Sequence, residues 1–462
     1  MTTSRAATDT PSSPAGKPGL RRVAFASLVG TTVEWYDYFL YGSSAALVFG
    51  QVFFPSSDPL TSTLLAFMAF AVGFVARPVG AVVFGHYGDR LGRKKLLVVS
   101  LLMMGGSTVL IGCVPSYDTI GMAAPILLTV LRLIQGCALG GEWGGAVLLV
   151  SEHGDARRRG FWASWPQAGL ATGNILAVGV LAVMSTALSR DDFVAWGWRV
   201  PFLLSAVLVL AGLWIRLSID ESPVFKEAHE ESAPSGKQHR PLVDLLRNNW
   251  RDILIAIGAR FSENIAYYVL TTFVLVYCVE HLGMPQQDAL IAVVIGSAVQ
   301  FCLIPCFGAL SDRVGRKPVY LAGAVGTGLW AWAFFMLLDT ASFPAAVLAI
   351  SIGLAFHSAM YAPQAAFFSE LFATRVRYTG TSVGAQFASV VAGAPAPIIA
   401  VALLQAYGTF QPIAVYLTLA SVVTVIAVSC ARETRGRDLT ETPTEAKAAP
   451  LVAAAKADVP TP

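Results

Sequence analysis

Several ionisable side chains of this chain lie inside segments that are otherwise apolar. A charge at the centre of a lipid bilayer costs at least about 2.5–3.5 kcal/mol on insertion scales, so it is retained only where it faces a cavity or a partner. Glu34 and Asp37 are three residues apart and share one face of a helix. Later apolar segments carry the others, namely Arg132 with Glu142, Arg260 with Glu263, and His357. Such groups could bind a charged solute or exchange protons.

The same charges also have a purely structural interpretation. The two carboxylates of the first segment could pair with an arginine of a later one and hold helices together. Arg260 and Glu263 could pair with each other, and His357 could be a core histidine with both ring nitrogens satisfied. Arg77 and Arg199 lie nearer the predicted span ends, where we expect snorkelling or structural salt bridges.

The composition predicts an all-α integral membrane protein. Hydrophobic residues make up 55% of the 462 residues and charged residues 13%, against roughly 45–50% and 25% in a soluble protein. The excess of apolar side chains must face lipid, and a span needs about 20 residues. Twelve apolar runs are long enough: 23–50, 61–84, 96–113, 120–150, 161–185, 196–219, 253–279, 289–310, 319–338, 343–368, 380–406 and 410–430.

The chain is duplicated. Gly85–Lys95 and Gly308–Lys317 share a Gly, Asp-Arg and Gly-Arg-Lys pattern, and each follows one apolar run and precedes another. Asp89 and Asp312 are equivalent, 223 residues apart (312 − 89). Two six-span halves of this kind are typical of transporters, whose solute site lies near the bilayer midplane between the halves. The buried charges fall in spans one, four, seven and ten, the equivalent helix of each three-span block, which indicates a shared central cavity.

The distribution of Lys and Arg predicts the topology. Basic residues concentrate in one set of loops, in both tails and in the central linker, so the positive-inside rule places both termini in the cytoplasm. The predicted organisation is a disordered tail at 1–19, an N-terminal six-helix bundle at 20–219, a cytoplasmic linker at 220–249, a C-terminal six-helix bundle at 250–431 and a disordered tail at 432–462.

Enzyme and metal chemistry find no support in the sequence. The six cysteines lie in or beside apolar runs without the polar flanks of a zinc site. Metal-spaced His and Glu, a nucleophile elbow and a phosphate-binding Gly-Lys loop are all missing from the sequence. We therefore expect no enzyme activity, metal, cofactor or nucleic-acid partner. A non-transporting membrane sensor is a remote alternative.

The duplicated loop resembles the signature loop of the major facilitator superfamily. Within that superfamily, Glu34-Trp-Tyr-Asp37, Arg77-Pro-Val-Gly80 and Trp196-Gly-Trp-Arg-Val-Pro201 are similar to the metabolite:proton symporter branch, which includes shikimate, α-ketoglutarate and proline/betaine carriers. Arg260 and Glu263 make the pattern most similar to the shikimate-type members.

The resemblance implies inward transport of a solute driven by the proton gradient, with two six-helix halves rocking about a central site. The residues it implies for proton coupling are Glu34, Asp37 and Arg132. Those expected at the solute are Tyr36, Arg132, Gln135, Glu142, Gln167, Arg260, Glu263, Asn264, Tyr267, His357, Gln364 and Gln386. The loops would supply a conformational latch from Gly85, Asp89, Arg90, Arg93, Asp312, Arg313 and Arg316.

The solute class follows from the charges that would meet it. Guanidinium groups at Arg132 and Arg260 suit a carboxylate held bidentately, so a small hydroxylated organic acid is the first expectation. A zwitterionic osmolyte such as proline or betaine, with its cation on tyrosine rings, is the alternative. The expected partners are the solute, protons and the lipid bilayer of the inner membrane, with the chain functional as a monomer.

Overall fold

The structure, a computed structural model, describes residues 20–91, 93–140, 156–218, 247, 249–372 and 377–437. The predicted N-terminal tail, nearly all of the linker, Glu142 and the chain beyond 437 lie outside these ranges. Side chains are not described for 85–95, so the predictions for Gly85, Asp89, Arg90 and Arg93 also lie outside the described part of the chain.

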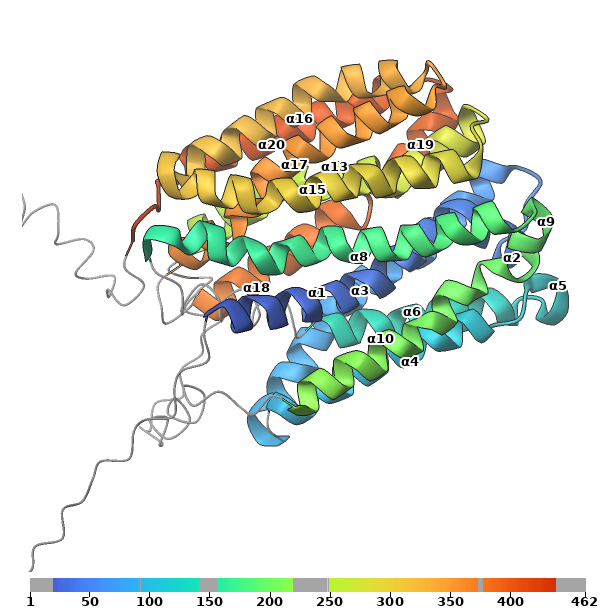
Figure 1. The fold of residues 1–462 in the computed structure, drawn as a ribbon, viewed down its shortest axis with the longest axis horizontal. Helices are drawn as coiled ribbons and strands as arrows, with labels where there is room; N and C mark the ends of the chain where they lie inside the picture. The colour runs from blue at the N-terminus through green and yellow to red at the C-terminus, as the bar shows by residue number, and fades with distance from the viewer. Residues whose placement is uncertain are drawn as a thin grey trace, which may run out of the picture.

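Long helices run side by side along the molecule (Figure 1). The first half consists of α1 (Leu20–Ser44) continued by η1 (Ala45–Phe49) and α2 (Gly50–Phe53), then α3 (Pro59–Leu91), α4 (Arg93–Cys113), α5 (Tyr117–Ile120), α6 (Ala123–Leu139), η2 (Ala156–Arg158), α8 (Arg159–Ala187), α9 (Arg190–Asp192), η3 (Phe193–Gly197) and α10 (Arg199–Ser218).

The second half repeats this plan. It consists of α13 (Trp250–Tyr268) continued by η4 (Val269–Phe273), α14 (Val274–Val276) and η5 (Tyr277–His281), then α15 (Gln286–Val314), α16 (Arg316–Leu338), α17 (Phe343–Leu371), α18 (Arg377–Ala388) with η6 (Ser389–Gly393) and α19 (Ala396–Tyr407), and α20 (Gln411–Cys430).

Length and composition identify the membrane-crossing helices. Among the described residues, 8 helices are long and apolar enough to cross a bilayer, and the pair Arg190–Gly197 and Arg199–Trp214, bent by 44°, makes up to 9. The apolar parts of α4 and α6 are shorter, at Val98–Cys113 and Ala123–Leu139. Large apolar side chains cover the outside, as with Leu329 at 73% exposure. Such a surface is stable only against lipid.

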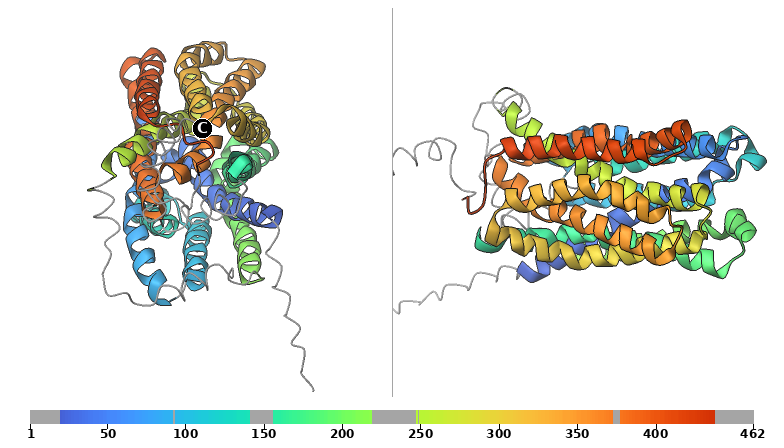
Figure 2. Two further views of the ribbon diagram at one scale, coloured as in Figure 1. Left: turned by 90° about the vertical axis from the view of Figure 1, so that its left-hand side faces the viewer. Right: turned by 90° about the horizontal axis from the view of Figure 1, so that it is seen from above.

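The two halves meet along a seam between α8 and α15. Helix α8 packs against α1 of its own half and against α15 and α17 of the other, and Figures 1 and 2 show α8 lying between the blue and yellow parts of the chain. The start of α1 and the end of α20 lie at the same end of the molecule, which we call the inner end (Figure 1). The opposite end, with α2, α5 and α9, is the outer end.

Glycines bring α3 and α6 unusually close together. A Cβ at Gly136 of α6 would lie 2.0 Å from the carbonyl oxygen of Gly73 in α3, and one at Gly80 would lie 1.9 Å from that of Cys137. No side chain fits at either position, so the two backbones touch. This contact lays Arg132 of α6 across α3, where it reaches the interior of the first half.

Candidate solute and proton site

The first half contains a small internal cavity lined by charged and polar groups. Its lining includes Asp37 and Tyr38 of α1, Arg77 of α3, and Arg132 and Gln135 of α6. Asp37 and Arg132 are each 2% exposed and Arg77 is 5% exposed. One carboxylate and two guanidiniums from three helices therefore share one water-poor space.

Arg132 is held mainly by aromatic faces. Its guanidinium carbon lies 4.5–4.7 Å from the ring centroids of Tyr38, Tyr41 and Phe70. Nη1 donates to Gln135 at 3.0 Å, and Nε to the Phe70 carbonyl at 3.4 Å. Nη2 has no hydrogen-bond partner among the described residues. Cation–π contact stabilises the buried charge while leaving one nitrogen available for a ligand.

Arg77 has the same kind of environment, and the expectation of snorkelling for it is wrong. Its guanidinium carbon lies 4.6 Å from the Tyr38 ring centroid and 4.5 Å from that of Phe74. Nε and Nη2 are buried without a hydrogen-bond partner in the described part of the chain. Only 5% of Arg77 is exposed, so its side chain is packed inside the first half instead of reaching outward.

Asp37 completes this group, which we call the N-cluster (Asp37, Arg77, Arg132 and Gln135). The charge of Arg132 acts on the Asp37 carboxylate, yet both carboxylate oxygens lack a hydrogen bond from any described residue. The Thr108 hydroxyl nearby donates to the Met104 carbonyl at 3.0 Å and accepts from Gln135 at 2.7 Å. A buried carboxylate without donors is costly, so the site is suited to take up a proton or a ligand.

The second half contains a different group, the C-cluster (Arg260, Glu263, Gln300, His357 and Gln364). Arg260 Nε lies 3.4 Å from Glu263 Oε2, and His357 Nε2 lies 3.3 Å from Glu263 Oε1. Gln364 also reaches Glu263 at 3.3 Å, and Gln300 contacts His357 Nδ1 at 2.8 Å. The Glu263 carboxylate is therefore satisfied by groups of its own half.

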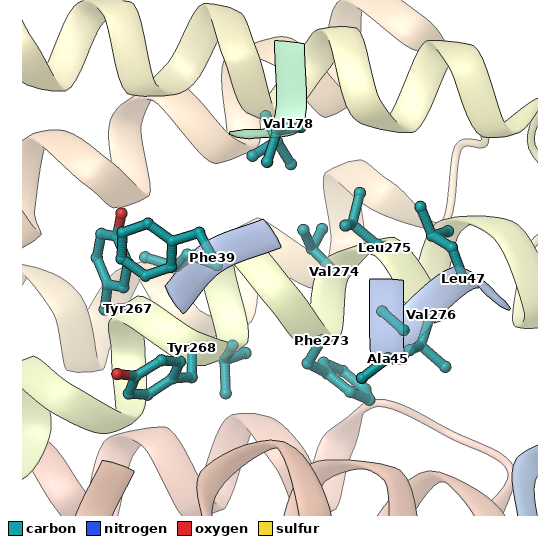
Figure 3. Close-up of a cluster of buried hydrophobic side chains, with 14 of the residues drawn as sticks. Phe39, Ala45, Leu47, Val178, Tyr267, Tyr268, Phe273, Val274, Leu275 and Val276 are labelled. Atoms are coloured by element: carbon teal, nitrogen blue, oxygen red, sulfur yellow. The ribbon is translucent and has the colours of Figure 1, made fainter. Parts of the chain in front are cut away.

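An aromatic layer separates the two clusters. The rings of Tyr38 and Tyr268 have centroids 6.2 Å apart, and those of Phe39 and Tyr267 are 5.2 Å apart. Figure 3 shows Phe39 of α1 lying against Tyr267 of α13, with Tyr268 beside them. The clusters lie on opposite sides of rings contributed by both halves, and Arg260, Glu263 and His357 do not line the cavity of the N-cluster.

The remaining predicted solute residues are mostly buried at this interface. Gln167 of α8 donates to the Tyr361 carbonyl at 3.2 Å, and Glu34 acts electrostatically on the Tyr361 side chain. Asn264 donates to Glu263 at 3.0 Å. Gln386 Oε1 has no partner within the described ranges. Tyr36 is different, because its hydroxyl donates to the Pro201 carbonyl of α10 at 2.8 Å.

At the inner end the halves are joined by charged groups. Asp312 accepts hydrogen bonds from the backbone N–H groups of Gly160 and Phe161, both at 2.8 Å, and from Arg316 at 2.6 Å. Arg159 of α8 donates to Glu370 of α17 at 2.9 Å, whereas Arg313 is exposed. Sequence reasoning did not place Arg159 or Glu370 in this network.

The first residues of the predicted C-terminal tail join the same network. Glu433 accepts from the backbone N–H groups of Arg316 and Lys317 at 2.9 and 3.0 Å, and so caps the start of α16. Thr434 donates to Glu370 at 2.8 Å. Residues 432–437 are thus packed against the second half rather than separate from it.

The outer end is joined by fewer contacts. Gln405 of α19 donates to Asp58 at 2.6 Å, and Arg190 contacts Gln286 and lies 3.9 Å from Glu280. Hydrogen bonds from Thr61 lower the pKa of the exposed Asp58 carboxyl below its ordinary value. Direct contacts therefore join the two halves at both ends.

The comparisons with known proteins identify transporters. The chain matches the Sugar (and other) transporter family over residues 23–446. It is 42% identical over 399 residues to the shikimate transporter of Escherichia coli (strain K12), covering 86% of this chain and 91% of that one. It is 40% identical over 428 residues to the inner membrane metabolite transport protein YhjE of that organism, with 90% and 95% coverage. The proline/betaine transporter of the same strain is 32% identical over 426 residues, with 91% and 85% coverage.

Solved structures give the same fold. The crystal structure of a D-xylose-proton symporter has a TM-score of 0.71 to this chain at 18% identity, covering 91% of this chain and 100% of that one. The partially occluded inward-open xylose transporter XylE of E. coli has a TM-score of 0.68 at 18% identity, with 91% and 99% coverage. This confirms the predicted twelve-helix major facilitator fold. The chain therefore belongs to the Sugar (and other) transporter family of the major facilitator superfamily, and it is a multi-pass membrane transporter and not an enzyme.

Proposed function

We propose that the protein is a proton-coupled symporter that carries a small organic acid into the cell, and that the N-cluster is where proton and solute meet. The observation that carries this proposal is the shared cavity of Asp37, Arg77 and Arg132, in which each of the three keeps buried polar atoms without a partner among the described residues.

The summed charge of Asp37, Arg77 and Arg132 links proton binding to binding of the acid. With Asp37 ionised the three groups sum to +1, and with Asp37 protonated they sum to +2. A neutral Asp37 no longer competes for the guanidiniums, so a carboxylate solute binds more tightly once the proton is on. Guanidinium–carboxylate hydrogen bonds are among the stronger ones in proteins and are directional. Proton and solute then cross together, because each favours the presence of the other.

The C-half side of the interface supports a hydroxylated acid. The hydroxyls of Tyr267 and Tyr361 and Oε1 of Gln364 are buried with no hydrogen-bond partner among the residues described. These groups donate to and accept from alcohols rather than neutralise charge. The acid end of the solute would face the N-cluster and its hydroxyls the C-cluster, with Gln135, Gln167, Asn264 and Gln386 as further polar contacts.

Alternating access would use the two ends of the molecule. The inner-end contacts of Asp312, Arg316 and Arg159 form a latch in this closed state and would separate when the halves tilt. The basic loops support a cytoplasmic position for this end, and the bacterial relatives support the inner membrane as the location.

Transport in proteoliposomes tests the proposal. Labelled shikimate, the solute in the name of one relative, is the first probe, under an inward acid gradient and in gradient-free counterflow. Wild type should accumulate the probe, whereas Asp37→Asn should retain counterflow and lose accumulation, because a permanently neutral side chain carries no proton. Asp191→Asn makes the same chemical change at an exposed outer position and should match wild type. Accumulation by Asp37→Asn at the wild-type level would refute the assignment.

A zwitterionic osmolyte is the second candidate, supported by the proline/betaine relatives. The faces of Tyr38 and Phe74 already hold Arg77, so these two rings are not open to a ligand cation, which favours the acid. Competition between labelled shikimate and unlabelled betaine separates the two. Displacement by betaine but not by other hydroxy acids would favour the osmolyte.

A further inference from the structure

The C-cluster contains an imidazole whose two nitrogens are both placed for proton binding. His357 is fully buried at 0% exposure. Its Nε2 faces the Glu263 carboxylate, and its Nδ1 faces the Gln300 carboxamide. A carboxylate accepts hydrogen bonds only, so Nε2 carries a hydrogen when Glu263 is ionised. Whether Nδ1 also carries a hydrogen depends on its partner, Gln300.

Gln300 can serve either state of the ring. As placed, its amide nitrogen donates to an unprotonated Nδ1, and its Oε1 is left without a partner among the described residues. Rotation of the amide by half a turn would present that oxygen to a protonated Nδ1. The imidazole can therefore gain a proton without losing a hydrogen bond. Most buried polar groups are committed to one arrangement, whereas this pair has two.

The charges around the ring allow the extra proton. Arg260 and Glu263 together sum to zero, so protonation of His357 would leave the cluster at +1, with Glu263 3.3 Å from the new charge. Asn264 and Gln364 also donate to Glu263. The ionisable side chains around the imidazole are Arg260, Glu263 and Tyr267 of α13, Tyr361 of α17, Tyr320 of α16 through Gln364, and Glu34 of α1 through Tyr361.

Gln300 also connects the ring to the motion of the halves. It lies on α15, which packs along α8 of the other half. One turn before it, Ser297 accepts a hydrogen bond from Asn174 of α8 at 2.9 Å. Tilting of the halves must change this seam, and with it the packing around the Gln300 amide. The protonation state of His357, to which the Gln300 amide responds, is thus linked to the access state.

We propose that His357, together with Glu263, forms a second proton-binding site in the C-terminal half, separate from Asp37, and that the Gln300 amide turns when the site is occupied. The inference goes beyond the proposed function, which needs only Asp37. It gives the carrier one exchangeable proton in each half.

Proton uptake by the purified full-length protein tests this without any solute. In potentiometric titrations between pH 8 and pH 5, His357→Gln should bind about one proton fewer than wild type. His281→Gln, at an exposed position at the outer end, shows the size of the loss when an accessible imidazole is removed. Ser358→Ala, whose hydroxyl bonds only its own helix at the Leu354 carbonyl, should titrate like wild type. A His357→Gln curve that superposes on the wild-type curve would overturn the proposal.

A measurement on the wild-type protein covers the case in which His357→Gln does not fold. In nitrogen-labelled histidine NMR, one buried imidazole should keep hydrogen on Nε2 and gain it on Nδ1 as pH falls. Gln300→Met, which removes the acceptor for that hydrogen, should prevent the change. A buried imidazole that stays neutral from pH 8 to pH 5 would contradict the proposal.

Transport separates this proposal from the first. For two coupled protons, each unit of pH gradient at clamped zero membrane potential supports about 100-fold accumulation of labelled shikimate, and for one proton about 10-fold, since one pH unit is a factor of ten per proton. His357→Gln should move the ratio from the first value toward the second and keep accumulation, whereas Asp37→Asn removes accumulation. An unchanged ratio in His357→Gln refutes the second site and leaves Asp37 unaffected.

Discussion

The N-cluster and the C-cluster contain similar residue types, but their bonding differs. Both combine carboxylate and guanidinium groups within buried helices facing the same interface. In the N-cluster the Asp37 oxygens and atoms of Arg77 and Arg132 have no hydrogen-bond partner among described residues, and aromatic faces stabilise the cations. In the C-cluster Glu263 is bonded by Arg260, His357, Asn264 and Gln364. The carboxylate of the first cluster lacks donors among the described residues, whereas that of the second is bonded within its own half.

The largest expected difference is in stability. Glu263→Gln should lower the free energy of unfolding by about 3–5 kcal/mol, because it leaves Arg260 buried without its carboxylate. Asp37→Asn should change stability much less, since no donor is lost. Thermal unfolding of the two detergent-purified variants measures this, and the double variant Arg260→Met/Glu263→Gln should recover part of the loss. Equal destabilisation by both single variants would contradict the comparison.

The next largest effect is on solute affinity. Arg77→Gln removes from the cavity a guanidinium whose Nε and Nη2 have no hydrogen-bond partner among the described residues. It should weaken binding of an organic acid about 10- to 100-fold, as expected for hydrogen bonds to charged groups at about 1.5–3 kcal/mol. Arg199→Gln makes the same change at a partly buried guanidinium that donates to the Gly112 and Val114 carbonyls near the outer end, and it is the control. Binding isotherms with shikimate provide the measurement. Equal weakening by both would show that the effect is structural.

The two ends of the molecule extend the comparison. Gly160 and Gly308 touch across the inner end, where a Cβ at Gly160 would lie 2.6 Å from the Gly308 carbonyl oxygen. Gly160→Val should prevent closure there. A thiol reagent added from the cytoplasmic side should then label the protein's cysteines several-fold faster. Gly179→Val, also in α8, has open space around its Cβ and should leave the rate unchanged. Unchanged labelling in Gly160→Val would mean that this contact does not close the inner end.

The smallest expected effect is at Asp58. Its folded pKa lies below its ordinary value because Thr61 donates to it. Its contribution to closure of the outer end is therefore fully present above about pH 4 and is lost as pH falls through the lower folded pKa. Thiol labelling from outside should rise less than about twofold below pH 4, and Asp58→Asn should remove this pH dependence. A large pH response that survives in Asp58→Asn would place its origin elsewhere, and the N-cluster would be the first candidate.

Some of the site was accessible from sequence and some was not. Asp37, Arg132, Arg260 and Glu263 are charged residues within apolar runs, and the cost of burying a charge was enough to single them out. Arg77 was misjudged, although it stands within a long apolar run beside Pro78. Its burial depends on the Tyr38 and Phe74 rings that pack on its guanidinium, which hydrophobicity alone does not show.

Gln300 was missed for a different reason. It is a neutral amide within the apolar run of α15. Burying a neutral amide costs much less free energy than burying a charge, so its presence in a span does not by itself indicate a function. Its importance lies in the 2.8 Å contact with His357, 57 residues away. A signal was present in its position as a polar residue in a span, but nothing local connected it to His357.

The amino-acid sequence by itself determined that this is a duplicated, twelve-span transporter, because apolar run lengths, repeated loops and buried charges are local properties of the chain. Tertiary structure alone decided which charges face each other. Pairing depends on how α3 and α6 approach through their glycines and on which aromatic rings lie between the halves, and these distances arise only when helices from distant parts of the sequence pack together.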